Sequence, residues 1–400
     1  MVQEFHKVGV VGLGTMGAGI VEVFSAGGFE VTGVEIDEAA LGRGRAHLEK
    51  SLAKAVSKGK LTEDEQRAIL GRVTFTTSRD HLSDADFVVE AVSEDIAVKR
   101  EVFTDLDHIC PPGTVLATNT SSLSVTEIAA MTQRPTKVVG LHFFNPAPVM
   151  NLVEVAGTVI SEEWAVEIAT EIAKRVGKTP VVVSDRAGFV ANALLVPYLN
   201  HAVSVYERGI ASREEIDSAV VKSAGMPMGP LALLDLIGID VALAVIDVLW
   251  AEFRGPRHAV APLLRRMATA GLLGRKSGRG FYDYSRDEPP EEQPTGPIAR
   301  RVRAKEAGFD LADLLLLPHL DDAVRMVGDT YATAEQVDTA IKLGCGYPKG
   351  PIELLNARGI ESVVTGLRAM IDMGLVPADS PAPLLNWLRH EGHDTLRDVD

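Results

Sequence analysis

Short strand-like runs alternate with helix-like segments over the first 185 residues of the chain. The strand-like runs lie at 8–11, 30–34, 73–76, 85–92, 115–118, 137–144 and 151–155, and a last run follows at 180–183. Helix-like segments lie between them, including 16–26, 38–58 and 96–109. Mostly apolar runs suit parallel strands, which are buried on both faces of the sheet. The alternation predicts a Rossmann-type, doubly wound α/β domain over residues 1–185.

Near residue 185 the pattern changes, and apolar positions such as Phe189, Leu194 and Tyr198 recur near helical spacing. Three segments of this helical part recur at one offset: 197–203 at 318–324, 216–220 at 337–341, and 225–230 at 346–351. A constant offset indicates a duplicated unit. We therefore expect an all-α domain over 186–285, a linker over 286–297, and a second all-α copy over 298–400 that carries no active site.

A glycine-rich stretch, Gly12-Leu13-Gly14-Thr15-Met16-Gly17, lies between the first predicted strand and the first predicted helix. Gly12 allows the tight turn, Gly14 lets the backbone approach a pyrophosphate, and Gly17 allows close packing of helix and strand. The second strand then ends at an acid, Glu35, which can accept hydrogen bonds from ribose hydroxyls. Alone, the stretch also fits a turn that binds nothing, but all these features together predict a dinucleotide site.

The residues after the second strand favour NAD over NADP. Glu35-Ile36-Asp37-Glu38 is acidic, and no arginine or lysine follows it directly. A 2′-phosphate would be repelled there rather than held.

The composition limits the classes of partner. A formal net charge of −15 over 400 residues would repel nucleic acid and anionic membranes at long range. No apolar run approaches the length of a membrane span, and the first residues show no secretory or transit pattern. The two cysteines suggest neither a disulfide framework nor a metal cluster. We therefore predict a cytoplasmic protein without metal, nucleic acid or membrane partners.

The helix predicted at 38–58 carries five cationic residues, Arg43, Arg45, Lys50, Lys54 and Lys58. Such a run is usually a solvated helix face. In a strongly acidic protein, however, it could hold a phosphorylated substrate.

Polar residues gather at the carboxyl ends of the predicted strands, where doubly wound sheets bind ligands. They include Glu35, Glu94, Ser121, His142 and Asn145. His142 suits proton removal from a carbinol, because the ordinary histidine pKa of about 6.5 lies near working pH. The short connection to the next strand would place Glu154 beside its ring. A lone histidine is more often structural, but its place at this edge favours catalysis.

Ser121 and Ser122 follow the strand at 115–118 and could simply cap the next helix. Ser124 suits that role better, because Glu127 stands three residues after it. Ser121 is then expected to be free for chemistry and to hold a substrate oxygen.

Four segments together resemble the L-3-hydroxyacyl-CoA dehydrogenases, a family that includes the 3-hydroxybutyryl-CoA dehydrogenases. They are Gly12–Gly19, Asn119–Leu123, Gly140–Pro146 and Gly188–Asn192. The resemblance covers about residues 5–285, and the later helical repeat resembles the C-terminal domain of the family again. It implies NAD-dependent oxidation of an L-3-hydroxyacyl-CoA to the 3-oxoacyl-CoA, or the reverse, with short chains such as 3-hydroxybutyryl-CoA the simplest expectation.

The resemblance also implies roles for single residues. His142 would be the general base or acid with Glu154 as its partner, while Ser121 and Asn192 would bind the substrate. The NAD-binding positions would be Gly12, Leu13, Gly14, Thr15, Met16, Gly17, Glu35, Glu94, Lys99, Asn145 and Lys276. Ser51 and Lys58 match positions that contact coenzyme A. The chain departs from the family at Ala193, where arginine is frequent, and at Glu35, where aspartate is common.

The resemblance extends to assembly. Single-copy members dimerise through their helical domains, so the duplicated chain is expected to be a monomer with an internal pseudo-dimer, or a homodimer. Two other functions stay open: a free β-hydroxyacid or sugar-acid dehydrogenase on a related fold, which would depend on a catalytic lysine, and a catalytically idle NAD-binding relative.

Overall fold

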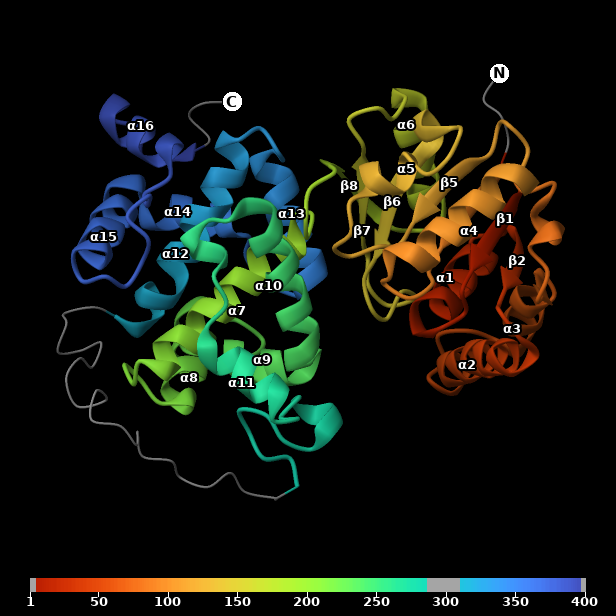
Figure 1. The fold of residues 1–400 in the computed structure, drawn as a ribbon. Helices are drawn as coiled ribbons and strands as arrows, with labels where there is room; N and C mark the ends of the chain where they lie inside the picture. The colour runs from red at the N-terminus through yellow and green to blue at the C-terminus, as the bar shows by residue number, and fades with distance from the viewer. Residues whose placement is uncertain (1–4, 286–309, 397–400) are drawn as a thin grey trace. The chain divides into compact units, whose positions relative to one another are not determined.

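The computed structural model describes residues 5–285 and 310–396. The chain divides into two compact units, 1–189 and 190–400. Figure 1 shows the first unit as a sheet with helices and the second as helices, in the order that the sequence predicts. The predicted linker at 286–297 and the predicted start of the second helical copy, 298–309, lie outside the described residues.

Eight strands form one sheet in the order β3-β2-β1-β4-β5-β6-β7-β8. They are β1 (Lys7–Val11), β2 (Glu30–Val34), β3 (Val73–Thr76), β4 (Phe87–Glu90), β5 (Val115–Thr118), β6 (Val138–Phe143), β7 (Leu152–Gly157) and β8 (Thr179–Ser184). Strands β1 to β6 run parallel, β7 is antiparallel to β6, and β8 is parallel to β7. The strand order reverses between β1 and β4, and this confirms the doubly wound fold predicted from the sequence.

Helices cover the sheet. They are α1 (Thr15–Ala26), α2 (Glu38–Ser57), α3 (Glu63–Leu70), α4 (Ile96–Ile109), α5 (Val125–Ala129) and α6 (Glu163–Arg175), with short 3₁₀ turns at Arg79–Leu82 and Pro135–Lys137. Polar side chains cap the starts of α2, α3, α4 and α5. Asp37 caps α2 by accepting from the amide of Ala40, and Thr62 and Glu65 form a capping box for α3. Helix α3 has no counterpart among the elements predicted above.

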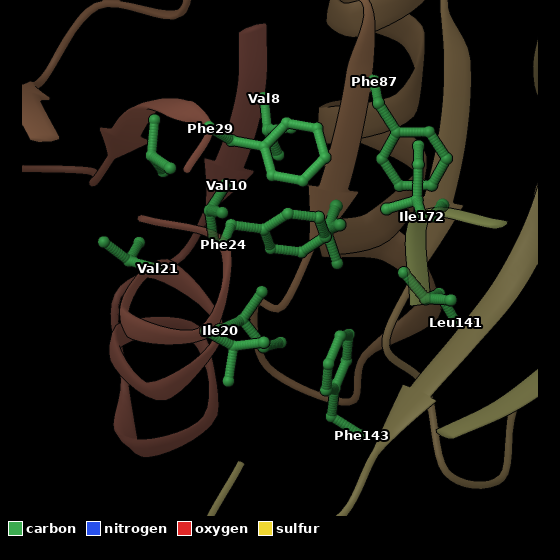
Figure 2. Close-up of a cluster of buried hydrophobic side chains, with 14 of the residues drawn as sticks. Val8, Val10, Ile20, Val21, Phe24, Phe29, Phe87, Leu141, Phe143 and Ile172 are labelled. Atoms are coloured by element: carbon green, nitrogen blue, oxygen red, sulfur yellow. The ribbon is translucent and has the colours of Figure 1, made fainter. Parts of the chain in front are cut away.

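Aromatic side chains fix α1 against the sheet. Phe24 of α1 is fully buried, and its ring lies 5.6 Å from that of Phe29 and 6.2 Å from that of Phe143, centroid to centroid. Figure 2 shows these rings among Val8, Val10 and Ile20. Because buried aromatic rings contribute strongly to core stability, this cluster holds the C-terminal half of α1 against the sheet.

The second unit is all helical. Its first copy holds α7 (Ala191–Glu207), α8 (Arg213–Ala224), α9 (Pro230–Ile237), α10 (Ile239–Phe253) and α11 (Pro262–Thr269), with 3₁₀ turns at Pro256–His258 and Arg275–Ser277. The second copy holds α12 (Leu311–Gly328), α13 (Ala334–Cys345), α14 (Pro351–Arg358), α15 (Ile360–Asp372) and α16 (Pro383–Glu391).

Equivalent side chains make equivalent hydrogen bonds in the two helical copies. Asp217 accepts hydrogen bonds from two amides at the start of α9, at 2.8 and 3.0 Å. Asp338 does the same at the start of α14, at 2.8 and 3.1 Å. The copies pack on each other within the unit through α7 and α12, where Nε2 of His201 lies 3.0 Å from the carbonyl oxygen of Leu314. The predicted duplication is therefore a pair of packed helical subdomains.

Candidate active site

The glycine-rich turn between β1 and α1 has the backbone geometry that a dinucleotide needs. Gly12 has φ +87°, and a Cβ there would lie 2.8 Å from the carbonyl oxygen of Ala91. A Cβ on Gly17 would lie 1.7 Å from the carbonyl oxygen of Gly12, so only glycine fits. Gly14 has no atom within 4 Å of its Cβ position, and no side chain caps the start of α1 there. The helix N-terminus therefore offers its amides to an anion.

Glu35, directly after β2, holds this turn in place. Its Oε1 accepts from the amide of Leu13 and its Oε2 from the amide of Ile36, both at 2.8 Å. A hollow of about 630 Å³ lies beside it and is lined by Gly12, Gly14 and Glu35, among others. The carboxylate thus lies at the wall of a space large enough for an adenosine half.

The segment 77–80 after β3 also lines this hollow, which sequence reasoning missed. It brings a cation, Arg79, into the pocket wall, although no cation follows Glu35 in the sequence. Arg79 is committed to acids on α4: it pairs with Asp105 and lies 3.4 Å from Glu101. This segment follows β3, the strand next to β2, and that position could have indicated that it lines the hollow.

His142 and Glu154 meet across the β6–β7 pair. The register places them directly opposite each other, as the short connection predicts, and Nδ1 of His142 lies 2.8 Å from Oε2 of Glu154. The Glu154 side chain is fully buried, and that of His142 is 8% exposed. The rings of Phe144 and Phe189 lie 4.5 and 5.7 Å from the imidazole, centroid to centroid. The imidazole is therefore held at one nitrogen and packed against two aromatic rings.

Glu94, after β4, accepts hydrogen bonds from the loop that follows β5. Its Oε1 accepts from the Thr120 hydroxyl at 2.5 Å, the Ser121 amide at 3.0 Å, and both the amide and hydroxyl of Ser122 at 3.2 and 3.1 Å. Ser124 caps α5 through the amide of Glu127, as predicted. The Ser121 amide is bound by this carboxylate, and the Ser121 Oγ lies 3.5 Å from the same oxygen, so the carboxylate fixes the backbone that carries the hydroxyl.

Lys99 lies beneath Glu94 rather than in the open site. Its side chain is 1% exposed, and its Nζ lies 2.8 Å from Oε1 of Glu90 and 3.4 Å from Oε2 of Glu94. Glu90, the last residue of β4, is fully buried and was not singled out from the sequence. An acid ending an apolar strand, as Glu35 does, was the signal that could have identified it. Asn145 stands exposed two residues beyond β6.

A second hollow, of about 680 Å³, contains both predicted coenzyme A positions. Ser51 and Lys58 of α2 line it. The other cationic residues in its wall are Lys54, Lys60, Arg175 and Lys178. Glu22 of α1 faces the same space, and burial raises the pKa of its carboxyl group, against the hydrogen bond from Ser51. The excess of cations suits a phosphorylated ligand.

Asn192 and Lys276 belong to the helical unit. Asn192 is the second residue of α7 and is partly buried. Lys276 is half-exposed, and its Nζ donates to Oδ2 of Asp240 at 2.6 Å.

Family comparisons agree with this geometry. Residues 7–186 match the family model described as 3-hydroxyacyl-CoA dehydrogenase, NAD binding domain. Residues 188–284 and 310–395 both match the C-terminal domain model of the same family. The chain belongs to the 3-hydroxyacyl-CoA dehydrogenase family. Its C-terminal domain is thus present in two segments, as the internal repeat predicts.

Individual relatives differ in how much of this family member they cover. A 3-hydroxybutyryl-CoA dehydrogenase of Mycobacterium tuberculosis is 50% identical over 286 residues, which is 71% of this chain and all of the relative. A 3-hydroxyadipyl-CoA dehydrogenase of Escherichia coli is 35% identical over 401 residues, which is 100% of this chain and 81% of the relative. A crystal structure of an E. coli 3-hydroxybutyryl-CoA dehydrogenase superposes with a TM-score of 0.88 at 30% identity and covers 96% of this chain and 98% of its own.

These findings make the protein an NAD-dependent dehydrogenase of the 3-hydroxyacyl-CoA class. The residues around the glycine-rich turn fit NAD: the Gly14 backbone is open to a pyrophosphate, and Glu35 stands where ribose hydroxyls would lie. Among the described residues, no helix is both long and apolar enough to cross a membrane.

Proposed function

We propose that the enzyme interconverts L-3-hydroxyacyl-CoA and 3-oxoacyl-CoA of short chain length, with His142 as the general base or acid. The observation that carries this proposal is the 2.8 Å contact between Nδ1 of His142 and Oε2 of Glu154, which are both buried. A buried carboxylate beside one imidazole nitrogen fixes the tautomer and stabilises the charged ring. The opposite nitrogen, Nε2, is then the atom that exchanges a proton with substrate.

Each remaining residue of the site has a defined task in this proposal. The glycine-rich turn and Glu35 would hold NAD, which would supply the acceptor for the hydride from C3. Nε2 of His142 takes the proton of the 3-hydroxyl group, and Glu154 balances the positive charge that the ring acquires. By the family resemblance, Ser121 and Asn192 would hydrogen-bond the substrate oxygen or the thioester region. Phe144 and Phe189 limit water around the ring, which strengthens its interaction with Glu154.

The cationic hollow beside α2 supports coenzyme A as the carrier. Ser51 and Lys58 would contact the nucleotide end of the thioester, and the cations around them would balance its phosphates. A free β-hydroxyacid would have no use for this hollow. Inhibition by free coenzyme A separates the two substrate classes.

A six-carbon dicarboxylic substrate is a second candidate. One relative that aligns over 100% of this chain, second helical copy included, is named a 3-hydroxyadipyl-CoA dehydrogenase, while a solved structure that covers 96% of the chain is named a 3-hydroxybutyryl-CoA dehydrogenase. The shorter relatives named 3-hydroxybutyryl-CoA dehydrogenase align over about 70% of the chain. Comparing kcat/KM for 3-hydroxybutyryl-CoA and 3-hydroxyadipyl-CoA decides between the candidates.

For assembly, we propose a monomer in which the second helical copy occupies the surface used for dimerisation in single-copy members. A homodimer of the duplicated chain is the alternative. We propose a cytoplasmic location, since the two cysteines suggest no disulfide framework and fit a reducing compartment.

The deciding experiment follows absorbance at 340 nm while acetoacetyl-CoA is reduced, with NADH and NADPH in parallel. We expect turnover with NADH and at least tenfold lower kcat/KM with NADPH, because Glu35 would repel a 2′-phosphate. A protein that binds NADH but does not turn over acetoacetyl-CoA or a longer thioester would contradict the proposal and favour the idle relative.

A further inference from the structure

We propose that Glu90 is a positioning residue: through Lys99 it holds Glu94, and Glu94 holds the loop that carries Ser121. The inference rests on the proposed function only in assigning Ser121 to the substrate. None of the four segments on which the family resemblance was based contains Glu90, which ends β4.

The Glu90 carboxylate is buried with all its oxygens engaged. Oε1 accepts from Nζ of Lys99 at 2.8 Å and from the amide of Val92 at 2.7 Å. Oε2 accepts from Nζ of Lys99 at 3.0 Å and from the hydroxyl of Thr118 at 2.7 Å. The ion pair therefore ties the ends of β4 and β5 to the first turn of α4.

Stability alone gives little reason for this pair. Removing two charges from water costs several kcal/mol per ion, and apolar residues of similar volume in such places are often equally stable. Glu90 and Lys99 have 0% and 1% of their side chains exposed, so this cost applies in full. A task other than stability then accounts for the charges.

We assign that task to the placement of Glu94, the second acid that Lys99 contacts. Its Oε2 lies 3.4 Å from Nζ of Lys99, and its Oε1 accepts the four hydrogen bonds from Thr120, Ser121 and Ser122 described above. Burial raises the pKa of Glu94, but Lys99 and these donors outweigh it, so the pKa is lowered. Glu94 therefore stays ionised and can accept all four hydrogen bonds.

Lys99 shares its single charge unequally between the two acids. The two short contacts to Glu90 keep the ammonium group close to β4, and the longer one leaves Glu94 free to turn its other oxygen toward the serine loop. If Glu90 lost its charge, Lys99 would draw nearer to Glu94 and pull it from the amides of Ser121 and Ser122. The loop would lose its fixed geometry without loss of the fold.

The first test is the Glu90→Gln variant, which removes one charge and little volume. We expect kcat for acetoacetyl-CoA reduction to fall at least tenfold. Hydrogen exchange of a peptide spanning 119–124 should be at least tenfold faster, because the amides of Ser121 and Ser122 lose their acceptor. Unchanged kcat and unchanged exchange would overturn the proposal.

Asp107→Asn is the matched control. Asp107 also lies on α4, is 7% exposed at its side chain, and pairs with Arg134 at 2.7 Å. It thus loses the same charge from a buried pair that touches neither Glu94 nor the serine loop. We expect kcat and the exchange of 119–124 to stay within twofold of the parent. A loss equal to that of Glu90→Gln would indicate a general structural effect and contradict the proposal.

The Lys99→Met variant gives a pH-dependent readout that a purely structural role of the Glu90–Lys99 pair would not produce. The charged groups near Glu94 are Lys99 and, behind it, Glu90, while the adjacent Asp95 binds the amides of Ala97 and Val98. Without the cation, Glu94 should protonate at higher pH, and kcat for acetoacetyl-CoA reduction should begin to fall at a higher pH than in the parent as the pH is lowered. A parallel profile would overturn the proposal. Accelerated exchange in an enzyme inactive on acyl-CoA would retain this inference and contradict the proposed substrate instead.

Discussion

Tyr198 and His319 occupy the same position in the two helical copies, and their rings face each other with centroids 5.1 Å apart. Both side chains are buried, at 3% and 1% exposure. The contact lies where α7 of one copy packs on α12 of the other. In a symmetric dimer, a residue at this position would contact the same residue of the other chain. Here a tyrosine contacts a histidine, so the two sides of the α7–α12 contact are not equivalent.

Acid should weaken the contact between α7 and α12. Burial lowers the pKa of His319 to about 4, so the folded protein holds a neutral ring that protonates near pH 6.5 once unfolded. Stability is therefore present above pH 6.5 and is lost as the pH falls toward 4, by about 2 kcal/mol between pH 7 and pH 5. His319→Phe should lack this decline in urea unfolding. If the parent and variant curves against pH are parallel, His319 is not responsible.

Truncation should uncover the helical surface used for pairing. A chain that ends near Tyr284 keeps the family's NAD-binding and first C-terminal segments but exposes the face of α7 that contacts α12. We expect it to dimerise or aggregate, because a large uncovered apolar face favours association. Light scattering after size-exclusion chromatography measures this directly. A well-behaved monomer would show that the face does not need a partner.

The His142–Glu154 pair should control chemistry and not cofactor affinity. His142→Ala should lower kcat by about 10²- to 10⁴-fold, the range that general acid–base residues supply. Glu154→Gln keeps the hydrogen bond but not the charge, so we expect a smaller loss with the same sign. Fluorescence titration should give an unchanged Kd for NADH in both variants. Full turnover by His142→Ala would reject the proposed base.

Cations in the α2 hollow should set the affinity for acyl-CoA. Lys58→Ala should raise KM for acetoacetyl-CoA severalfold with little effect on kcat, and the effect should shrink at high salt because exposed charges are screened. Lys50→Ala is the matched control, since Lys50 is exposed on the same helix and does not line the hollow. Equal effects of the two substitutions would point to general charge attraction.

Local pattern was sufficient for the parts of the site built from consecutive residues. The turn around Gly12 and the acid at Glu35 depend on one strand, one turn and one helix. The opposition of His142 and Glu154 follows from two strands joined by a short connection. Each of these could be predicted because sequence distance limits spatial distance.

Contacts across separate elements could not be read in this way. Glu90 and Lys99 meet because the end of β4 lies under the first turn of α4, and no spacing rule requires it. Ser121 was expected to be free because Ser124 suits the capping role; its contact with Glu94, 27 residues earlier in the chain, has no local signal. The wall formed by 77–80 needed the order of β3, β2 and β1 in the sheet.

Joining two helical copies in one chain changes the mass action of their pairing. In a dimer of single-copy chains, the paired fraction falls on dilution, because stability depends on protomer concentration. Here the partner of α7 is α12 of the same chain, so the encounter is intramolecular and its effective concentration is set by the connecting segment. The contact between α7 and α12 should therefore persist at enzyme concentrations at which the same contact between two separate chains would dissociate.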